Sequence, residues 1–100
     1  MRNQDLTGTY MGGKLIRRAN LAGACLQGAS FYRSDLTDAD LARADLRGAD
    51  FAGATLTRTT LVECMLDNAD FTGANVGDAI IVGSSLTMPL ISNPTECETK

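Results

Sequence analysis

Large apolar residues recur at every fifth position along most of the chain, and this period of five is the clearest feature of the sequence. From Ala19 to Ser84, the position two residues earlier always holds a small residue, most often alanine. Eight of the ten glycines lie two positions after a large residue. The large positions are Leu6, Met11, Ile16, Leu21, Leu26, Phe31, Leu36, Leu41, Leu46, Phe51, Leu56, Leu61, Leu66, Phe71, Val76, Ile81 and Leu86.

A period of five fits neither an α-helix nor a flat β-strand. In a helix, five residues rotate by about 140° beyond one full turn, so the large side chains would form no stripe. In a strand, the period of two would send alternate large residues to opposite faces. A short strand followed by a corner every five residues satisfies the pattern. The small and the large residue then point inward, the residue between them points outward, and the next two make the corner, where glycine relieves the backbone.

The spacing of the phenylalanines predicts how many corners make one circuit. Three phenylalanines are twenty residues apart, so four five-residue units per coil would stack them in one column. Coils of parallel strands would then lie about 4.8 Å apart, and the handedness of crossovers favours a right-handed path. We predict an all-β, right-handed quadrilateral parallel β-helix of about four coils of 20 residues. The expected core columns are Phe31, Phe51 and Phe71 on one face, and Leu21, Leu41, Leu61 and Ile81 on another.

Three consecutive units resemble a known repeat. Ala39-Asp-Leu-Ala-Arg, Ala44-Asp-Leu-Arg-Gly and Ala49-Asp-Phe-Ala-Gly are similar to the A(D/N)LXX unit of the pentapeptide repeat family. The resemblance implies the same quadrilateral β-helix that the spacing predicts. It implies little about function, because members of the family differ and most have no assigned activity.

The departures from the repeat suggest three segments. Gln4 and Lys14 occupy inward positions that a narrow core does not accept, so residues 1–18 are expected to form an irregular first coil. Residues 19–88 are expected to form the regular β-helix. Pro89 cannot donate a hydrogen bond to the ladder, so residues 89–100 are expected to form a polar tail.

Composition and charge narrow the classes of function. The 100 residues suffice for one domain, and the net charge of −3 is too mild to favour direct nucleic-acid binding. The basic cluster of Lys14, Arg17 and Arg18 has little aromatic interleaving and is expected to be solvated. No apolar run is long enough to predict a membrane span, and no signal-peptide segment is evident at the start, so we expect a cytoplasmic location.

The residue inventory disfavours an enzyme. Histidine is absent, which removes the commonest general base and metal ligand. The aspartates between the inward pairs are expected on flat, exposed faces, with Asp50 and Asp70 adjacent. Cys25 is expected to point outward, Cys64 inward, and Cys97 lies in the tail, so free thiols are expected. We therefore predict no catalytic residues, no cofactor and no metal site.

Apolar residues near the C-terminal end predict an interface. They interrupt a face whose earlier outward positions are polar, and such a cluster on a small protein favours partner binding or homodimer formation. Alternatively, residues 89–100 fold back and cover it. The leading hypothesis is a non-catalytic binding or scaffold protein with an unidentified protein partner. The predicted interface residues are Val62, Ile80, Val82, Met88 and Leu90.

A second hypothesis follows from the family resemblance and the acidic second half of the chain. Some members imitate the shape and charge of DNA, bind type II topoisomerases such as DNA gyrase, and confer quinolone resistance. The modest net charge and the short chain argue against this role. The residues that would form the acidic surface are Glu63, Asp67, Asp70 and Asp78.

Overall fold

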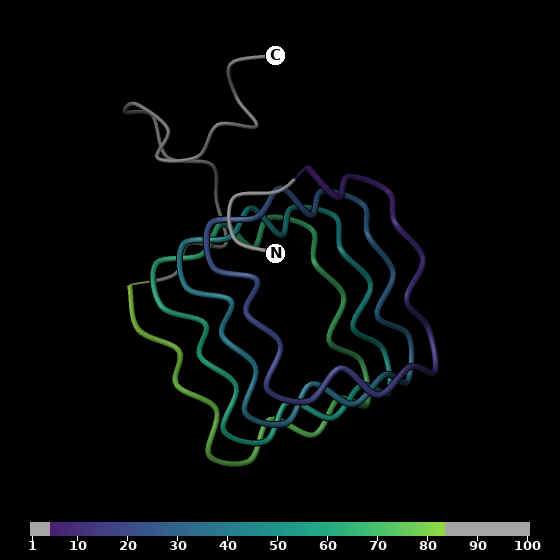
Figure 1. Ribbon diagram of the computed structural model, residues 1–100, viewed down its shortest axis with the longest axis vertical. Coiled ribbons are helices and arrows are strands. Elements are labelled where there is room, and N and C mark those ends of the chain that lie inside the picture. The colour runs from purple at the N-terminus through teal and green to yellow at the C-terminus, as the bar shows by residue number, and fades with distance from the viewer. Residues whose placement is uncertain (1–4, 84–100) are drawn as a thin grey trace.

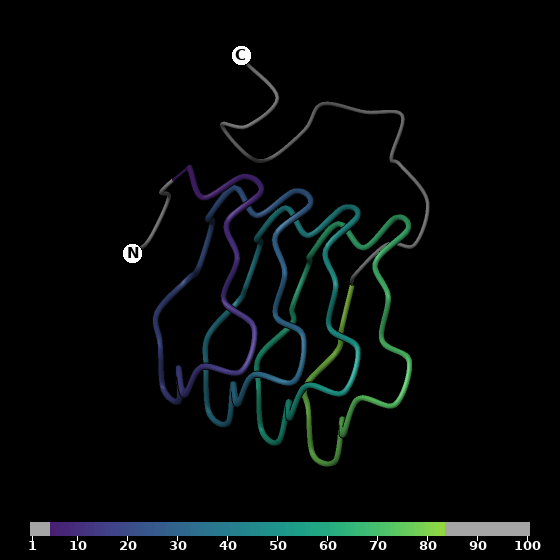
Figure 2. The ribbon, with the colours of Figure 1, turned by 90° about the vertical axis from the view of Figure 1, so that its right-hand side faces the viewer.

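The computed structural model describes residues 5–83, which wind into a stack of square coils (Figures 1 and 2). In this part of the chain, parallel bridges join each outward residue to the one twenty positions later, from Asp5–Cys25 to Thr60–Ile80. Each bridge is one residue long, and turns occupy the corners between bridges. The fold is the predicted right-handed quadrilateral parallel β-helix with 20 residues per coil.

The coil has four sides, three of which are called after an outward residue and one, the Phe face, after the phenylalanines that lie behind it in the core. Each side holds one column of outward positions, spaced by twenty, and the chain passes through the sides in a fixed order. The columns are Asp5, Cys25, Asp45 and Met65 (the Cys25 face); Tyr10, Ser30, Asp50 and Asp70 (the Phe face); Leu15, Asp35, Thr55 and Asn75 (the Asp35 face); and Asn20, Asp40, Thr60 and Ile80 (the Asp40 face).

Backbone hydrogen bonds explain why five residues form the repeating unit. In the unit 30–34, the N–H groups of Ser30, Phe31 and Arg33 donate to carbonyl oxygens of neighbouring coils. The N–H of Ser34 donates to the carbonyl oxygen of Phe31 at 2.9 Å and closes the turn. Four of the five N–H groups are therefore satisfied by the backbone, as a structure without long strands requires.

The second corner residue adopts a left-handed conformation at every fifth position from residue 8 to residue 83. Glycine occupies eight of these corners, which explains the spacing of the glycines. The other corners hold residues with side chains, such as Arg18 with φ of 62° and Arg43 with φ of 60°. A left-handed residue with a Cβ costs roughly 1–2 kcal/mol, so the stack of coils must hold these corners in place.

The core is a set of columns inside the coils. Phe31, Phe51 and Phe71 stack with ring centroids 4.8 and 4.9 Å apart and nearly parallel planes, which confirms the predicted column. Thr59 and Cys64 stand in for alanine at inward positions. Their Oγ1 and Sγ atoms donate to the carbonyl oxygens of an earlier coil at 2.7 and 2.9 Å.

The leucine column is also confirmed, but its last member is not buried. Leu21, Leu41 and Leu61 are almost completely buried. Ile81 is half exposed, because no described coil lies beyond it. The C-terminal end of the described stack therefore presents core side chains on its surface.

The first coil departs from the expectation of irregularity. From Asp5 onward it makes the same bridges and turns as the later coils. Lys14 is tolerated because its position lies in the outermost described coil, where its side chain is exposed. Gln4 and the expected tail, residues 89–100, lie outside the described residues.

Candidate functional site

The outward aspartates are part of the turn. The carboxylate of Asp40 accepts a hydrogen bond from the N–H of the first corner residue, Ala42, at 3.0 Å. This is the fifth N–H group of the unit, which the backbone leaves unpaired. Asp, Asn or Ser at the outward position can supply the acceptor. The same contact is made by Asp5, Asn20, Ser30, Asp35, Asp45, Asp50, Asp70 and Asn75.

At two of these positions the hydrogen bonds favour the ionised carboxylate. Hydrogen bonds from Thr37 lower the pKa of Asp35, and hydrogen bonds from Thr72 lower the pKa of Asp70. A carboxyl group with a lowered pKa is a poor general acid at neutral pH. Asp50 and Asp70 are bridged neighbours as expected. Within residues 5–83, no group of three or more Cys, Asp or Glu side chains could hold a metal ion.

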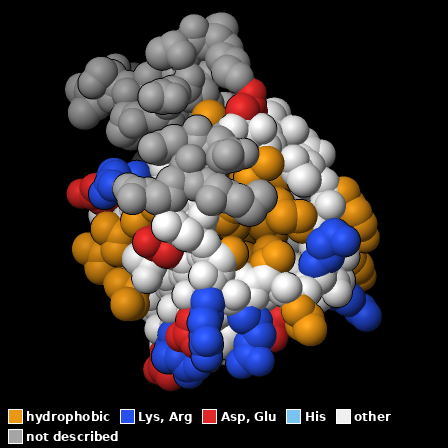
Figure 3. Space-filling view, viewed as in Figure 1, with side chains coloured by type: hydrophobic (Ala, Val, Ile, Leu, Met, Phe, Trp, Pro, Cys, Tyr) orange, Lys and Arg blue, Asp and Glu red, His pale blue; other side chains and the backbone are white. Residues whose placement is uncertain are grey.

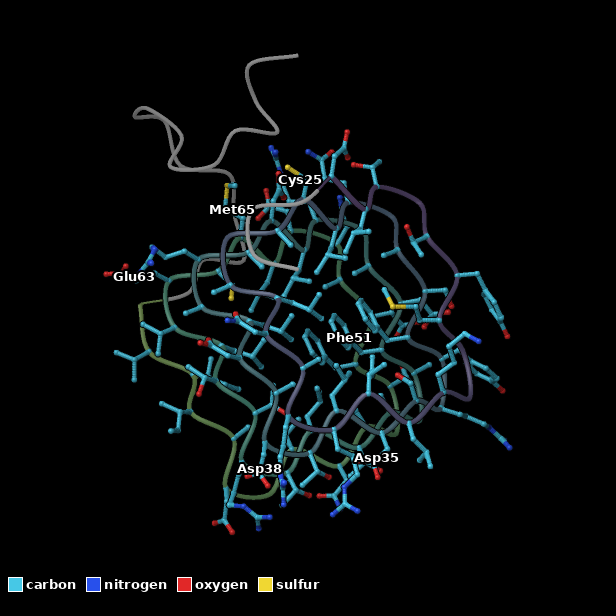
Figure 4. The ribbon with its side chains drawn as sticks, viewed as in Figure 1. Cys25, Asp35, Asp38, Phe51, Glu63 and Met65 are labelled. Carbon is cyan, nitrogen blue, oxygen red and sulfur yellow. The ribbon has the colours of Figure 1, made fainter. Side chains whose placement is uncertain are left out.

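One corner column carries alternating charges. Arg18, Asp38, Arg58 and Asp78 follow one another at intervals of one coil. Arg58 Nε and Nη2 donate to the two carboxylate oxygens of Asp38 at 2.7 and 3.1 Å. This pairing lowers the pKa of Asp38 and raises the pKa of Arg58. Blue and red side chains meet along this edge in Figure 3, and Figure 4 labels Asp38 there.

The basic cluster expected at the start of the chain is partly neutralised. Arg17 lies 3.6 Å from the carboxylate of Asp35 in the next coil. Arg18 belongs to the alternating column, where it lowers the pKa of Asp38. The structure therefore offers little support for a basic recognition surface in the first coil.

Apolar side chains gather at the C-terminal end of the described coils. Val76, Ile80, Ile81 and Val82 are 44%, 49%, 51% and 62% exposed, and together they are named the C-terminal patch. Val62 is half-buried on the corner one coil before Val82. The structure thus brings the predicted Val62, Ile80 and Val82 together. Met88 and Leu90 lie outside the described residues.

Val76 and Ile81 were missed as interface candidates. Their inward positions placed them in the core, and the period of five cannot show which coil is the last one covered. The signal available in the sequence was Pro89, which marks the end of the repeat.

The structure does not bring the four predicted acidic residues onto one surface. Glu63 lies at the corner before the Cys25 face, Asp67 at the corner after it, and Asp70 on the Phe face. Asp78 lies two coils beyond Asp38 in the same corner column, and Figure 4 shows the Asp38 corner well separated from Glu63. One carboxylate oxygen of Asp67 is buried and receives no hydrogen bond from the described residues. The four charges form a ring around the last coil.

The Cys25 face is unlike the other three, because three of its four outward side chains are buried, while Asp5 is exposed. Cys25, Asp45 and Met65 are only 3%, 0% and 3% exposed. The carboxylate of Asp45 accepts hydrogen bonds from Arg47 Nε and Gln27 Nε2, both at 2.8 Å. Figure 4 places Cys25 and Met65 on the same side of the stack.

The state of the cysteines corrects the expectation of free thiols. Cys25 is disulfide-bonded. Cys64 is a buried thiol that points inward, as expected. The repeat pattern could not reveal the disulfide, because the outward position accepts almost any residue.

Comparison with family models decides the identity of the fold. The model for pentapeptide repeats matches residues 15–53 and 49–87, with eight copies of the repeat. The chain belongs to the pentapeptide repeat family. The predicted resemblance is thereby confirmed, and the outward Asp or Asn of the family unit is explained here by its hydrogen bond to the turn.

Solved structures of other pentapeptide repeat proteins are similar to this chain. HetL of the cyanobacterium Nostoc, which is involved in the regulation of heterocyst differentiation, is 35% identical with a TM-score of 0.78. The match covers 83% of this chain and 38% of HetL. A pentapeptide repeat protein of the Arabidopsis thaliana thylakoid lumen is 40% identical with a TM-score of 0.54, over 85% of this chain and 63% of that protein. The chain therefore spans less than two thirds of either relative.

The remaining comparisons add no functional information. QnrB1, a plasmid-mediated fluoroquinolone resistance protein, is 21% identical with a TM-score of 0.27, over 87% of this chain and 63% of QnrB1, and this likeness carries no argument. No curated protein matches the sequence. Among residues 5–83 there is no helix long and apolar enough to cross a membrane.

Proposed function

We propose that this pentapeptide repeat protein is a non-catalytic binding or scaffold protein that acts through protein contacts on its faces and self-associates by its C-terminal coil. The C-terminal patch carries this proposal. Four large apolar side chains that are each about half exposed form an unusual end for a small protein. They adjoin the last described coil, whose edge is a template for further pairing.

The outward carboxylates support a binding role over a catalytic one. Turn N–H groups donate hydrogen bonds to these carboxylates. The pKa values of Asp35 and Asp70 are lowered. Side chains committed to the fold in this way leave flat faces of regular shape. Such faces suit recognition by a partner of matching shape and charge.

Sedimentation equilibrium tests self-association. The wild-type chain is expected to form a dimer at micromolar concentration, and the double variant Ile80→Asp/Val82→Asp is expected to be a monomer with an unchanged circular dichroism spectrum. Burying a carboxylate in an apolar contact is costly, so the interface should not survive.

Leu15→Asp is the matched control. Leu15 is an exposed outward apolar residue, 79% accessible, in the first coil. Its replacement should leave the dimer intact. A monomeric wild-type chain, or a dimer lost equally in both variants, would refute association through the C-terminal coil.

A second candidate function is regulation of DNA gyrase by imitation of DNA. One observation favours it: residues 59–83 contain Glu63, Asp67, Asp70 and Asp78 and no Lys or Arg. The distribution of these acids around the last coil, rather than on one face, makes it the weaker candidate. The acidic ring could resemble duplex DNA only if a second copy extended it.

A gyrase supercoiling assay tests this candidate. The protein would be titrated with and without a quinolone, at about 50 and 300 mM salt. DNA mimicry predicts inhibition or protection that weakens steeply with salt, and loss of the effect when the four acids are neutralised together. No effect, or an effect independent of salt, would exclude it.

A further inference from the structure

We propose that copies of this protein stack head to tail, so that the first coil of one copy continues the β-helix beyond the last described coil of another. The inference rests on the proposed self-association through the C-terminal coil and names the surface that this coil binds. Figure 2 shows the first coil, in purple, and the last described coil, in yellow-green, at opposite ends of the stack. The parts concerned are residues 10–23 and 70–83, which form the Phe, Asp35 and Asp40 faces of the two end coils.

Each end coil lacks one neighbour, so a row of backbone groups at each end has no backbone partner among residues 5–83. At the C-terminal end, the row consists of N–H groups at large inward positions and carbonyl groups at small inward positions. At the N-terminal end, it consists of the N–H and carbonyl groups of outward residues. The groups are the N–H of Phe71, Val76 and Ile81 and the carbonyl of Ala69, Ala74 and Ala79 at one end, and both groups of Tyr10, Leu15 and Asn20 at the other.

The register of the columns brings these two rows together. A second copy that continues the columns places its Tyr10 next to Asp70, because both residues belong to the outward column of the Phe face. Inside the chain, the N–H of Phe51 donates to the carbonyl oxygen of Asp70 at 2.7 Å. The N–H of Phe71 would donate in the same way to the carbonyl oxygen of Tyr10 in the second copy. The N–H of that Tyr10 would donate to the carbonyl oxygen of Ala69, which completes the pattern of the interior coils.

A second copy fits this edge better than an extended peptide from another protein. Each bridge is one residue long, and a left-handed corner recurs at every fifth position. An extended strand that adds to a sheet edge runs straight past the first corner and therefore pairs with one side only. A chain that turns at the same corners pairs with three sides, and the coils of this protein have those corners.

The inward side chains of the two ends also match. Val76 and Ile81 are 44% and 51% exposed at the C-terminal end, whereas Leu61, one coil before Ile81, is fully buried. In the stacked register, Val76 would lie against Ile16 and Ile81 against Leu21 of the second copy. The junction would remove these apolar surfaces from water and give the end coil the cover that the interior coils have.

The distribution of charge favours contact between unlike ends. Residues 5–23 hold three basic side chains and one acidic side chain, whereas residues 65–83 hold three acidic side chains and no basic one. A head-to-tail junction brings opposite charges together. A junction between two C-terminal ends would bring two acidic coils together.

The alternating column of charges would continue across the junction. Within the chain, Arg58 follows Asp38 by one coil and donates to both of its carboxylate oxygens at 2.7 and 3.1 Å. Arg18 of the second copy would follow Asp78 at the same spacing. The junction would therefore add an ion pair of a kind that the fold already contains.

Lys14 limits the strength of the contact. It occupies an inward position of the first coil, where its side chain is exposed, and the stacked register places it against Ala74 of the other copy. Because an unpaired buried charge is costly, its ammonium group would have to extend past the junction to solvent. Lys14→Ala is therefore expected to strengthen association several-fold, an effect that contact between two C-terminal ends would not produce.

Sedimentation equilibrium over a wide range of concentrations tests the order of the ends. A head-to-tail contact leaves a free end on each side and does not close, so the mean mass should rise beyond that of a dimer, whereas contact between two identical ends stops at the dimer. Tyr10→Pro/Leu15→Pro removes two edge N–H groups that have no backbone acceptor within residues 5–83, at positions where an edge tolerates proline. The matched control, Tyr10→Ala/Leu15→Ala, loses the same side chains and keeps the N–H groups. The proline variant should associate at least about tenfold more weakly than the alanine variant.

Mixing two variants tests the contact directly. The proline variant lacks a competent N-terminal end, and Ile80→Asp/Val82→Asp lacks a competent C-terminal end. Each alone should be a monomer at concentrations at which the wild type associates, and an equimolar mixture should form a dimer that grows no further. A mixture that stays monomeric would overturn the proposal.

The same measurements separate the two proposals. A monomeric wild type would refute both the self-association and the head-to-tail order. A wild type that stops at the dimer, together with equal association of the proline and alanine variants, would refute the head-to-tail order and leave the self-association standing. If the proline variant loses the circular dichroism spectrum of the wild type, Lys14→Ala decides, and unchanged association of that variant would overturn the head-to-tail order.

Discussion

Replacement of Phe51 by alanine should be among the most destabilising single changes in this protein. Phe51 is fully buried and lies between Phe31 and Phe71, with centroid distances of 4.8 and 4.9 Å. Removal of a buried phenylalanine side chain typically costs about 3–5 kcal/mol. Each aromatic contact that is lost contributes about 0.5–1.5 kcal/mol beyond area burial, which places Phe51→Ala toward the upper part of that range.

Phe71→Ala is the comparison that makes this prediction specific. Phe71 is only partly buried, and among the described residues it has one ring neighbour. Its replacement should therefore cost about half as much as that of Phe51, because less burial and one ring contact are lost. The same substitution at two positions of one column thus separates the contribution of stacking between coils from the chemistry of the side chain.

Urea denaturation followed by circular dichroism measures both free energies of unfolding, with the redox state kept constant. For a domain of this size, each kcal/mol corresponds to about 4–8 °C in Tm, so Phe51→Ala should lower Tm by at least about 12 °C. If Phe51→Ala does not fold, Phe51→Leu and Phe71→Leu provide the same comparison at smaller cost. An equal or smaller loss at position 51 would refute the view that stability resides in contacts between successive coils.

Three further predictions concern the turns and the charged column. Asp40→Ala should destabilise the protein by about 1 kcal/mol, because a turn N–H loses its acceptor, whereas Asp40→Asn should recover most of the loss in the same urea titration. Arg43→Gly should stabilise the protein by up to about 1 kcal/mol, because glycine adopts the left-handed corner conformation without strain. The gain should exceed that of Asn68→Gly, since asparagine tolerates this conformation better than arginine. Equal increases in Tm for the two variants would contradict this explanation. The pKa of Asp38 is lower in the folded chain than its ordinary value of 3.8, because Arg58 donates hydrogen bonds to the carboxylate. The stabilisation of the folded state by this pair is therefore complete above pH 3.8 and is lost as the pH falls below that value. Thermal melts between about pH 5 and 2 should show a smaller loss of Tm in Asp38→Asn than in the wild type.

The fold was predictable because every unit of five repeats the same local chemistry. The spacing of Phe31, Phe51 and Phe71 alone fixed four corners per coil, and the structure stacks their rings as expected. The expected irregularity of the first coil is not seen in its described part, residues 5–18, where Lys14 does not need to fit a core. In the outermost described coil, that position is open to solvent.

The surface was less predictable than the core. The separation of Glu63, Asp67 and Asp78 could have been read from the sequence, since every five residues turn the chain by a quarter of a circuit. The burial of Asp45 and the bonded state of Cys25 could not, because both depend on what lies against an outward face. A repeat pattern specifies which side chains point outward but not which of them will be covered.

The bridges between residues twenty positions apart restrict how this chain can lengthen or shorten during evolution. Deletion of one unit of five would move every later residue by one side of the square and place the Phe71 ring over a leucine column. Duplication of a whole circuit would leave all four columns in register and add only new copies of existing contacts. Viable length variants of such a protein should therefore differ by multiples of twenty residues. An exchanged segment can begin at any point of a circuit, provided that its length is also a multiple of twenty.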